Sequence, residues 1–187
     1  MVKILIVLIL APVLLKIVVL LIKRGLLHRK IVKACKTLNV TVKKSAPWFK
    51  SVFMVRGSTD YVIDDKIKVS VLTLPYRNAR FHFVPDKRLV EVYISLFQSF
   101  LIGRTTYKPV ATIRNTFKFA QFNVCLDAED GFKHIMLVYP VAREVTCVKG
   151  NCVEQLYNGD EIKGGIVFNT SSFFFEHLEQ YLSDSAE

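Results

Sequence analysis

The sequence predicts an α+β protein in which an N-terminal transmembrane helix precedes one small mixed-sheet cytoplasmic domain with flanking helices. The chain opens on an almost purely aliphatic stretch, basic residues follow at once, and short strand-like segments dominate the remainder. Strands that do not alternate regularly with helices are typical of α+β folds. We therefore divide the chain into a transmembrane anchor at 1–22, a basic amphipathic juxtamembrane helix at 23–38 and one soluble domain at 39–187.

The aliphatic stretch covers residues 4–22, and sixteen of its nineteen residues are Ile, Leu or Val. As a helix it is roughly 29 Å long, close to the ~30 Å hydrocarbon core of a bilayer. Pro12 and Lys16 disfavour insertion, but the aliphatic side chains outweigh them by a few kcal/mol, roughly. We predict an uncleaved, single-pass anchor. The alternatives are a cleaved signal peptide, whose apolar region is usually shorter, and a buried core helix, which the lack of a polar face disfavours.

Charge is distributed unevenly along the chain. Twelve Lys or Arg and no acidic residue precede Asp60, whereas fourteen basic and sixteen acidic residues occupy the remainder, so the net charge of +10 sits in the first third. Basic residues concentrate on the cytoplasmic side of membrane segments, which places the soluble domain in the cytoplasm. In that reducing compartment the four cysteines are expected to be thiols.

The residues that follow the anchor form a candidate membrane-surface site. Apolar residues recur at helical spacing from Leu26 to Leu38, which predicts a helix whose apolar stripe packs on the soluble domain. The basic residues have three open interpretations: a topology signal on a solvated face, a site for anionic lipid or, least favoured, for nucleic acid. The candidate lipid-binding residues are Lys23, Arg24, Arg29, Lys30, Lys33 and Lys36.

Alternation and turn residues predict the elements of the first half of the soluble domain. The predicted strands are 40–42, a hairpin of 61–63 and 67–74, and a second hairpin of 80–84 and 89–96. In strand 80–84, Arg80 and His82 point to one face while Phe81 and Phe83 point to the other. No structure is predicted for the apolar patch at 46–55. Residues 98–124 hold either a helix near 113–122 or an irregular aromatic-rich segment.

The second half continues with strands and ends on a helix. The predicted strands are 134–139, 145–148, 153–156 and 166–168, and the first of these is compact and apolar enough to be central. Asn158-Gly159-Asp160 is a strong tight-turn signal. Ser172 is placed to cap a helix at 173–182. Its inward-facing residues are expected to be Phe174, Leu178, Tyr181 and Leu182.

One local pattern suggests chemistry. Arg56-Gly57-Ser58-Thr59-Asp60 opens the first hairpin, whose second strand carries Lys68-Val69-Ser70. This pattern resembles the core of restriction-endonuclease-like nucleases, in which one carboxylate opens a strand, D/E-x-K follows on the next, and two carboxylates hold a divalent metal. Asp60 matches the first carboxylate, but the second strand lacks both the carboxylate and the lysine. Glu91 is the only later candidate.

That resemblance covers about forty residues. Segments 139–144 and 158–162 are in addition similar to uncharacterised, membrane-anchored bacterial proteins. Together the likenesses imply a nuclease-like fold that has lost its catalytic set, with Asp60 and Glu91 as weak catalytic candidates. The alternative for Asp60 is a turn residue that opens a strand, as Asp often does.

Two further features have competing interpretations. Cys147 and Cys152 flank a predicted turn, but a structural zinc site needs four ligands and no second pair occurs, so no metal or cofactor is predicted. Aromatic and basic residues interleave at 114–122, which is typical either of a platform for single-stranded nucleic acid or, as we prefer, of one face of a core.

Three functions follow from these patterns. We favour a non-catalytic, membrane-anchored module that binds a protein partner of unknown identity. A membrane-tethered, metal-dependent nuclease or nucleic-acid-binding domain that uses Asp60 and Glu91 is the first alternative. A surface module for anionic lipid is the second.

Overall fold

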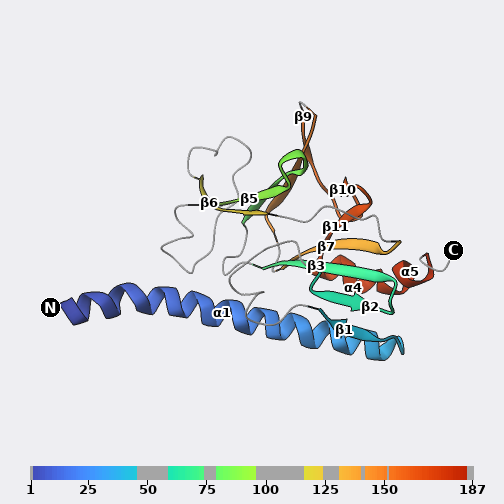
Figure 1. Ribbon diagram of the computed structural model, residues 1–187, viewed down its shortest axis with the longest axis horizontal. Coiled ribbons are helices and arrows are strands. Elements are labelled where there is room, and N and C mark those ends of the chain that lie inside the picture. Colours follow the sequence, from blue (N-terminus) through green and yellow to red (C-terminus); the bar gives the residue numbers. More distant parts are fainter. Residues whose placement is uncertain are drawn as a thin grey trace.

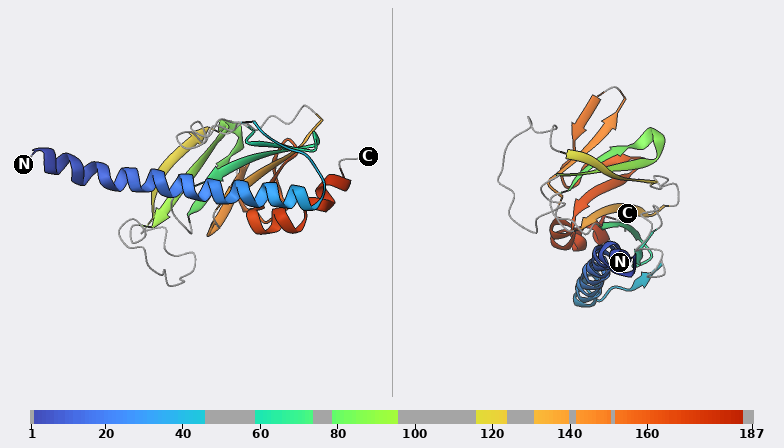
Figure 2. Two further views of the ribbon diagram at one scale, coloured as in Figure 1. Left: turned by 90° about the horizontal axis from the view of Figure 1, so that it is seen from below. Right: turned by 90° about the vertical axis from the view of Figure 1, so that its left-hand side faces the viewer.

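The structure is a computed structural model that describes residues 2–45, 59–73, 79–95, 116–123, 131–139, 142–150 and 152–184. It confirms the α+β class, because two mixed sheets are combined with a small number of helices (Figure 1). The layers are helices, a first sheet and a second sheet, with α1, α4 and α5 on the outer side of the first sheet (Figure 2).

The first layer contains the long helix α1 (Val2–Thr37), a single uninterrupted element of 36 residues. The predicted anchor and the predicted juxtamembrane helix are therefore one helix, with Pro12 and Gly25 both inside it. Within the described part of the chain, no helix has the length and apolar character needed to cross a membrane, so the structure does not support the span predicted at 4–22.

The first sheet has six strands in the order β1-β2-β3-β7-β11-β10. They are β1 (Val42–Lys44), β2 (Tyr61–Ile63), β3 (Ile67–Thr73), β7 (Lys133–Tyr139), β11 (Ile166–Thr170) and β10 (Glu161–Lys163). The three middle strands β3, β7 and β11 are parallel, and the outer pairings are antiparallel. The prediction that β7 is central is confirmed. Its run from Ile135 to Val138 is buried throughout, as expected for a strand covered on both faces.

The second sheet has five strands in the order β6-β5-β4-β8-β9. They are β6 (Thr116–Asn123), β5 (Leu89–Ser95), β4 (Arg80–Val84), β8 (Glu144–Lys149) and β9 (Cys152–Gln155), with a 3-10 turn, η1 (Pro85–Lys87), between β4 and β5. The chain passes from the first sheet to the second after β3 and again after β7. The strands before the two crossings, β3 and β7, pair in parallel in the first sheet, and the strands after them, β4 and β8, pair in parallel in the second.

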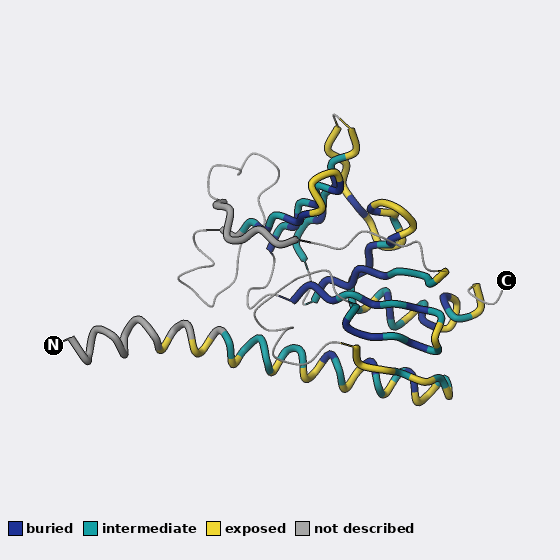
Figure 3. The backbone as a smooth tube through the Cα atoms, viewed as in Figure 1, coloured by how far each residue is buried: buried dark blue, intermediate teal, exposed yellow. Residues whose placement is uncertain are grey.

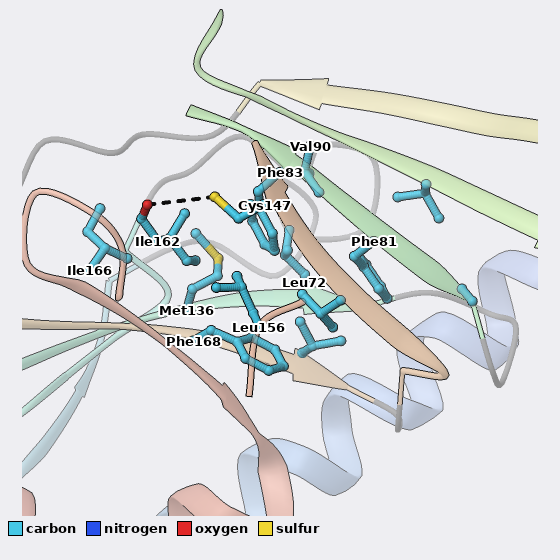
Figure 4. Packing of buried hydrophobic residues seen from close by; sticks show 14 residues of the cluster. Leu72, Phe81, Phe83, Val90, Met136, Cys147, Leu156, Ile162, Ile166 and Phe168 are labelled. Carbon is cyan, nitrogen blue, oxygen red and sulfur yellow. Dashed lines mark hydrogen bonds between the residues drawn. The ribbon is translucent and has the colours of Figure 1, made fainter. Parts of the chain in front are cut away.

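Two apolar cores lie on the two faces of the first sheet. The inter-sheet core contains aromatic and aliphatic residues of both sheets and the buried Cys147, whose thiol lies 3.7 Å from the carbonyl oxygen of Ile162 (Figure 4). The helix-side core joins the opposite face of the sheet to α1, α4 (Ser171–Glu176) and α5 (Leu178–Ser183). The buried residues that the helices contribute are Leu27, Ile31, Cys35, Phe174, Leu178 and Tyr181.

Several local predictions need correction. The first strand lies two residues later than expected, and the helix considered near 113–122 is wrong, because Thr116–Asn123 is strand β6 and pairs with β5. The single helix predicted at 173–182 is two short helices separated at His177. Thr170, and not Ser172, occupies the N-cap position, without a side-chain cap bond. The patch at 46–55 lies outside the described residues.

Candidate functional site

The best-defined polar site joins α1 to the first sheet. Arg24 Nη1 lies 2.9 Å from Asp60 Oδ1, and Arg24 Nη2 donates a 2.9 Å hydrogen bond to the carbonyl oxygen of Val71. The backbone N–H of Val71 in turn donates to Asp60 Oδ2 over 2.7 Å. The two charged side chains are only 14% and 9% exposed. One carboxylate, one guanidinium and the backbone N–H and C=O of one residue, Val71, therefore form a closed, nearly buried network that we call the Arg24–Asp60 lock.

Local structure positions Asp60 for this role. Its backbone N–H donates to Val69 and its carbonyl accepts from Ser45, so the residue is fixed at the entrance of β2. Arg24 reaches it from α1, one turn before the buried Leu27. A buried ion pair is tolerated when hydrogen bonds satisfy the remaining polar atoms, and here both carboxylate oxygens have a partner. In this geometry Asp60 holds α1 against the first sheet.

Two aromatic residues lie next to the lock. The rings of His28 and Tyr61 are stacked, with centroids 5.7 Å apart. Burial, helped by the charge of Asp60, raises the pKa of Tyr61 to about 12. Burial and the nearby Lys44 lower the pKa of His28, which favours a neutral imidazole. The surroundings of the lock thus keep both rings uncharged at neutral pH.

The second weak catalytic candidate lies elsewhere. Glu91 is on β5 in the second sheet, whereas Asp60 opens β2 in the first, so the structure does not bring the two carboxylates to one strand pair. Over the residues that are described, no group of three or more His, Cys, Asp or Glu side chains could hold a metal ion. Cys147 is buried and Cys152 is exposed, and both are free thiols.

Glu91 belongs to a row of polar side chains on the outer face of the second sheet. Tyr93 Oη donates a 2.7 Å hydrogen bond to Glu91 Oε2, and His82 Nδ1 lies 2.8 Å from Thr146 Oγ1. The prediction that Arg80 and His82 point to one face of β4 and Phe81 and Phe83 to the other is confirmed, and the two phenylalanines are on the buried face. The neighbours of His82 come from cross-strand register, which pairs it with Glu91 on one side and with Thr146 on the other. Sequence reasoning paired β4 with β5 but missed this row, because the register of β4 with the distant strand β8, which adds Thr146, leaves no local signal.

Replacing Glu91 by alanine is expected to return the pKa of Tyr93 from about 12 toward its ordinary value of 10. The hydrogen bond to the Glu91 carboxylate is the largest cause of the raised pKa, ahead of burial and of the carboxylate charge. Because the folded-state pKa is raised, this bond stabilises the fold fully below pH 10 and is lost as the pH rises through about 12. Alkaline absorbance titration of the tyrosinate band measures the change.

Glu144→Ala is the matched control for that titration. It removes a carboxylate from the same face of the sheet, where Glu144 Oε2 lies 3.1 Å from Arg80 Nε and has no contact with Tyr93 among those described. Identical titrations of the two variants would contradict the assignment of the raised pKa to Glu91.

The structure separates the six basic residues that sequence analysis grouped as a membrane-surface site. Arg24 is held by Asp60 and Val71, which removes it from the candidates for lipid contact. Lys23 is half-buried. The remaining four, all exposed on α1, are Arg29, Lys30, Lys33 and Lys36.

Comparison of the chain with protein-family models, with curated proteins and with solved structures found no match. The resemblance to restriction-endonuclease-like nucleases therefore stays a prediction from about forty residues.

Proposed function

We propose that this protein is a non-catalytic, membrane-attached binding module in which α1 serves both as the attachment and as part of the domain core. The observation that carries the proposal is the continuity of α1. One helix runs from the aliphatic stretch to Thr37, and its second half supplies buried residues to the helix-side core. The domain is thereby held rigidly by the attachment, with no linker between them.

The exposed surface of α1 supports membrane attachment. Large apolar side chains stay exposed along it: Leu14 at 58%, Leu15 at 61%, Val18 at 48%, Ile22 at 57% and Leu26 at 47%. Contiguous apolar surface of this kind usually marks a contact with a membrane or another protein. The opposite side of α1 packs on the first sheet from Leu27 to Cys35, so the exposed apolar residues face away from that core and need a second apolar surrounding.

Charge supports a cytoplasmic position for the domain. All twelve basic residues before Asp60 occur without an acidic neighbour in sequence, and most of them follow the aliphatic stretch. Such a bias is typical of the cytoplasmic flank of a membrane segment. The polar row around Glu91 and His82 faces away from α1, and it is the surface that we propose for a protein partner.

The full chain is expected to sediment with membranes, to resist extraction by high salt, and to be released by detergent. The physical reason is the exposed aliphatic surface of α1, which neither salt nor alkali makes soluble. Leu14→Lys combined with Val18→Lys is expected to move a large part of the protein to the soluble fraction. Val153→Lys, at another exposed valine on β9, is the control and should leave fractionation unchanged.

A reporter fused after Glu187 tests the orientation. Activity of a reporter that works only in the cytoplasm is the expected result. Recovery of the unmodified chain in the detergent-free soluble fraction would contradict membrane attachment, and a signal only from an exterior reporter would contradict the cytoplasmic position.

A further inference from the structure

The outward face of α1 changes from apolar to basic along its length. We call it the outer stripe, and its members are Leu14, Leu15, Val18, Ile22, Leu26, Arg29, Lys33 and Lys36. Building on the proposed membrane attachment, we propose that this stripe lies lengthwise on an anionic lipid surface. The domain would then be held flat against the membrane, and not at the end of a stalk.

Helical geometry places these eight residues together. At 100° per residue they fall within about 120° of the helix circumference, and from Leu14 to Lys36 the stripe is about 33 Å long. All eight are exposed, and exposed positions recur turn after turn along this half of α1 (Figure 3). The stripe is thus one continuous strip of surface.

The domain occupies the opposite side of the helix. Arg24, Leu27, Ile31 and Cys35 project about 120° to 160° away from the centre of the stripe, and they contact the first sheet or are buried against it. Both sheets lie on one side of α1 in Figure 1 and in the right-hand view of Figure 2. A flat surface can therefore contact the outer stripe without displacing the sheets.

Charge identifies the surface as anionic. The basic members Arg29, Lys33 and Lys36 follow directly on the apolar members, and the first 59 residues contain no acidic side chain. Aliphatic side chains at the acyl boundary beside cations at the headgroups are the usual arrangement of an interfacial helix. A second copy of this chain fits less well, because a parallel two-fold contact along the stripe would bring like charges together and an antiparallel one would place the basic members of each copy on the apolar members of the other.

Lysine labelling of the unmodified full chain tests the orientation directly. The chain is reconstituted in vesicles of phosphatidylcholine alone or with added phosphatidylserine, treated with an amine-reactive reagent, and analysed by mass spectrometry. Lys33 and Lys36 are expected to be protected several-fold more in the vesicles that contain phosphatidylserine. Lys87 and Lys149, which are exposed on or next to the second sheet, and Lys163, which is exposed on the edge strand β10 of the first sheet, are expected to react equally in both.

A charge variant gives the second measurement. Arg29→Gln, Lys33→Gln and Lys36→Gln together should weaken partitioning onto phosphatidylserine vesicles by about 100-fold, since each basic residue near an anionic surface contributes roughly fivefold. The matched control is Lys87→Gln, Lys149→Gln and Lys163→Gln, which has the same net charge. Its partitioning should change by no more than about twofold.

The outcomes separate this inference from the proposed function. Equal labelling of Lys33 and Lys36 in both kinds of vesicle, with the two triple variants partitioning alike, would overturn the lengthwise orientation and leave membrane attachment intact. Failure of the unmodified chain to associate with either kind of vesicle would overturn both. Selective protection together with selective loss in the first triple variant supports the inference.

Discussion

Replacing Asp60 by alanine is expected to lower the free energy of unfolding by about 3–5 kcal/mol, because it leaves a nearly buried guanidinium without its partner. The backbone N–H of Val71 would lose its acceptor at the same time. Arg24→Ala should have a similar effect, since it leaves the Asp60 carboxylate buried without its cationic partner. Arg24→Lys keeps the charge but cannot bond both Asp60 and Val71, and we expect a smaller loss of about 1–2 kcal/mol.

Chemical denaturation of the full chain in mild detergent measures these changes. The double variant Arg24→Ala with Asp60→Ala should lose less stability than the sum of the two single variants, because it removes both charges and leaves no unpaired buried charge. Lys43→Ala is the control, since Lys43 and Asp65 form an ion pair whose side chains are 64% and 61% exposed. Such a pair contributes about 0–1 kcal/mol. If the losses of the two single variants simply add in the double variant, or are no larger than the loss in Lys43→Ala, the stabilising role of the Arg24–Asp60 lock is contradicted.

The lock also affects how a nuclease test is interpreted. A loss of activity in Asp60→Ala could follow from detachment of α1 and would not by itself identify a metal ligand. Asp60→Asn keeps the acceptor for Val71 and a similar shape, so it separates the two effects better. Its folded state should be checked before any activity is compared.

Leu27→Ala is expected to lower the free energy of unfolding by about 2–5 kcal/mol, because Leu27 is only 1% exposed in the helix-side core and its truncation leaves a cavity. The adjacent Leu26 is 47% exposed on the outer stripe. Leu26→Ala should therefore change stability by less than about 0.5 kcal/mol. The two variants carry the same substitution at neighbouring positions on opposite sides of one helix.

Thermal or chemical unfolding of the two variants, followed by near-ultraviolet circular dichroism, measures the difference. Leu26→Ala should instead weaken membrane association, which flotation with vesicles detects. Equal stability of the two variants would show that α1 does not complete the domain core. That result would remove the observation on which the proposed function rests.

Much of the fold was predictable because its signals are local. The hairpins β2–β3 and β4–β5 show alternation on each strand and turn residues between them, and both are confirmed. The central position of β7 followed from its unbroken apolar run. The strand β6 was missed because its sequence shows neither a clear helical nor a clear strand period. Only its pairing with β5 shows that it is a strand.

The candidate site was predictable in its parts but not in its arrangement. Asp60 was singled out as a carboxylate that opens a strand, and Arg24 as one of six basic residues near a membrane. Their contact joins residues 36 apart in the chain, and it changes the interpretation of both. Glu91 likewise belongs to no motif: its hydrogen-bond partner Tyr93 lies two residues along β5, and strand register places His82 beside it.

The sequence by itself determined the charge asymmetry, the aliphatic start and the α+β class, because composition and alternation act over a few neighbouring residues. Only the tertiary structure decided that α1 is one helix with a domain-facing side and an outer side. Which basic residues stay exposed, and which carboxylate is neutralised, depends on contacts between segments far apart in the chain. Such contacts form only when the sheet and the helix pack together, so no short stretch of residues contains them.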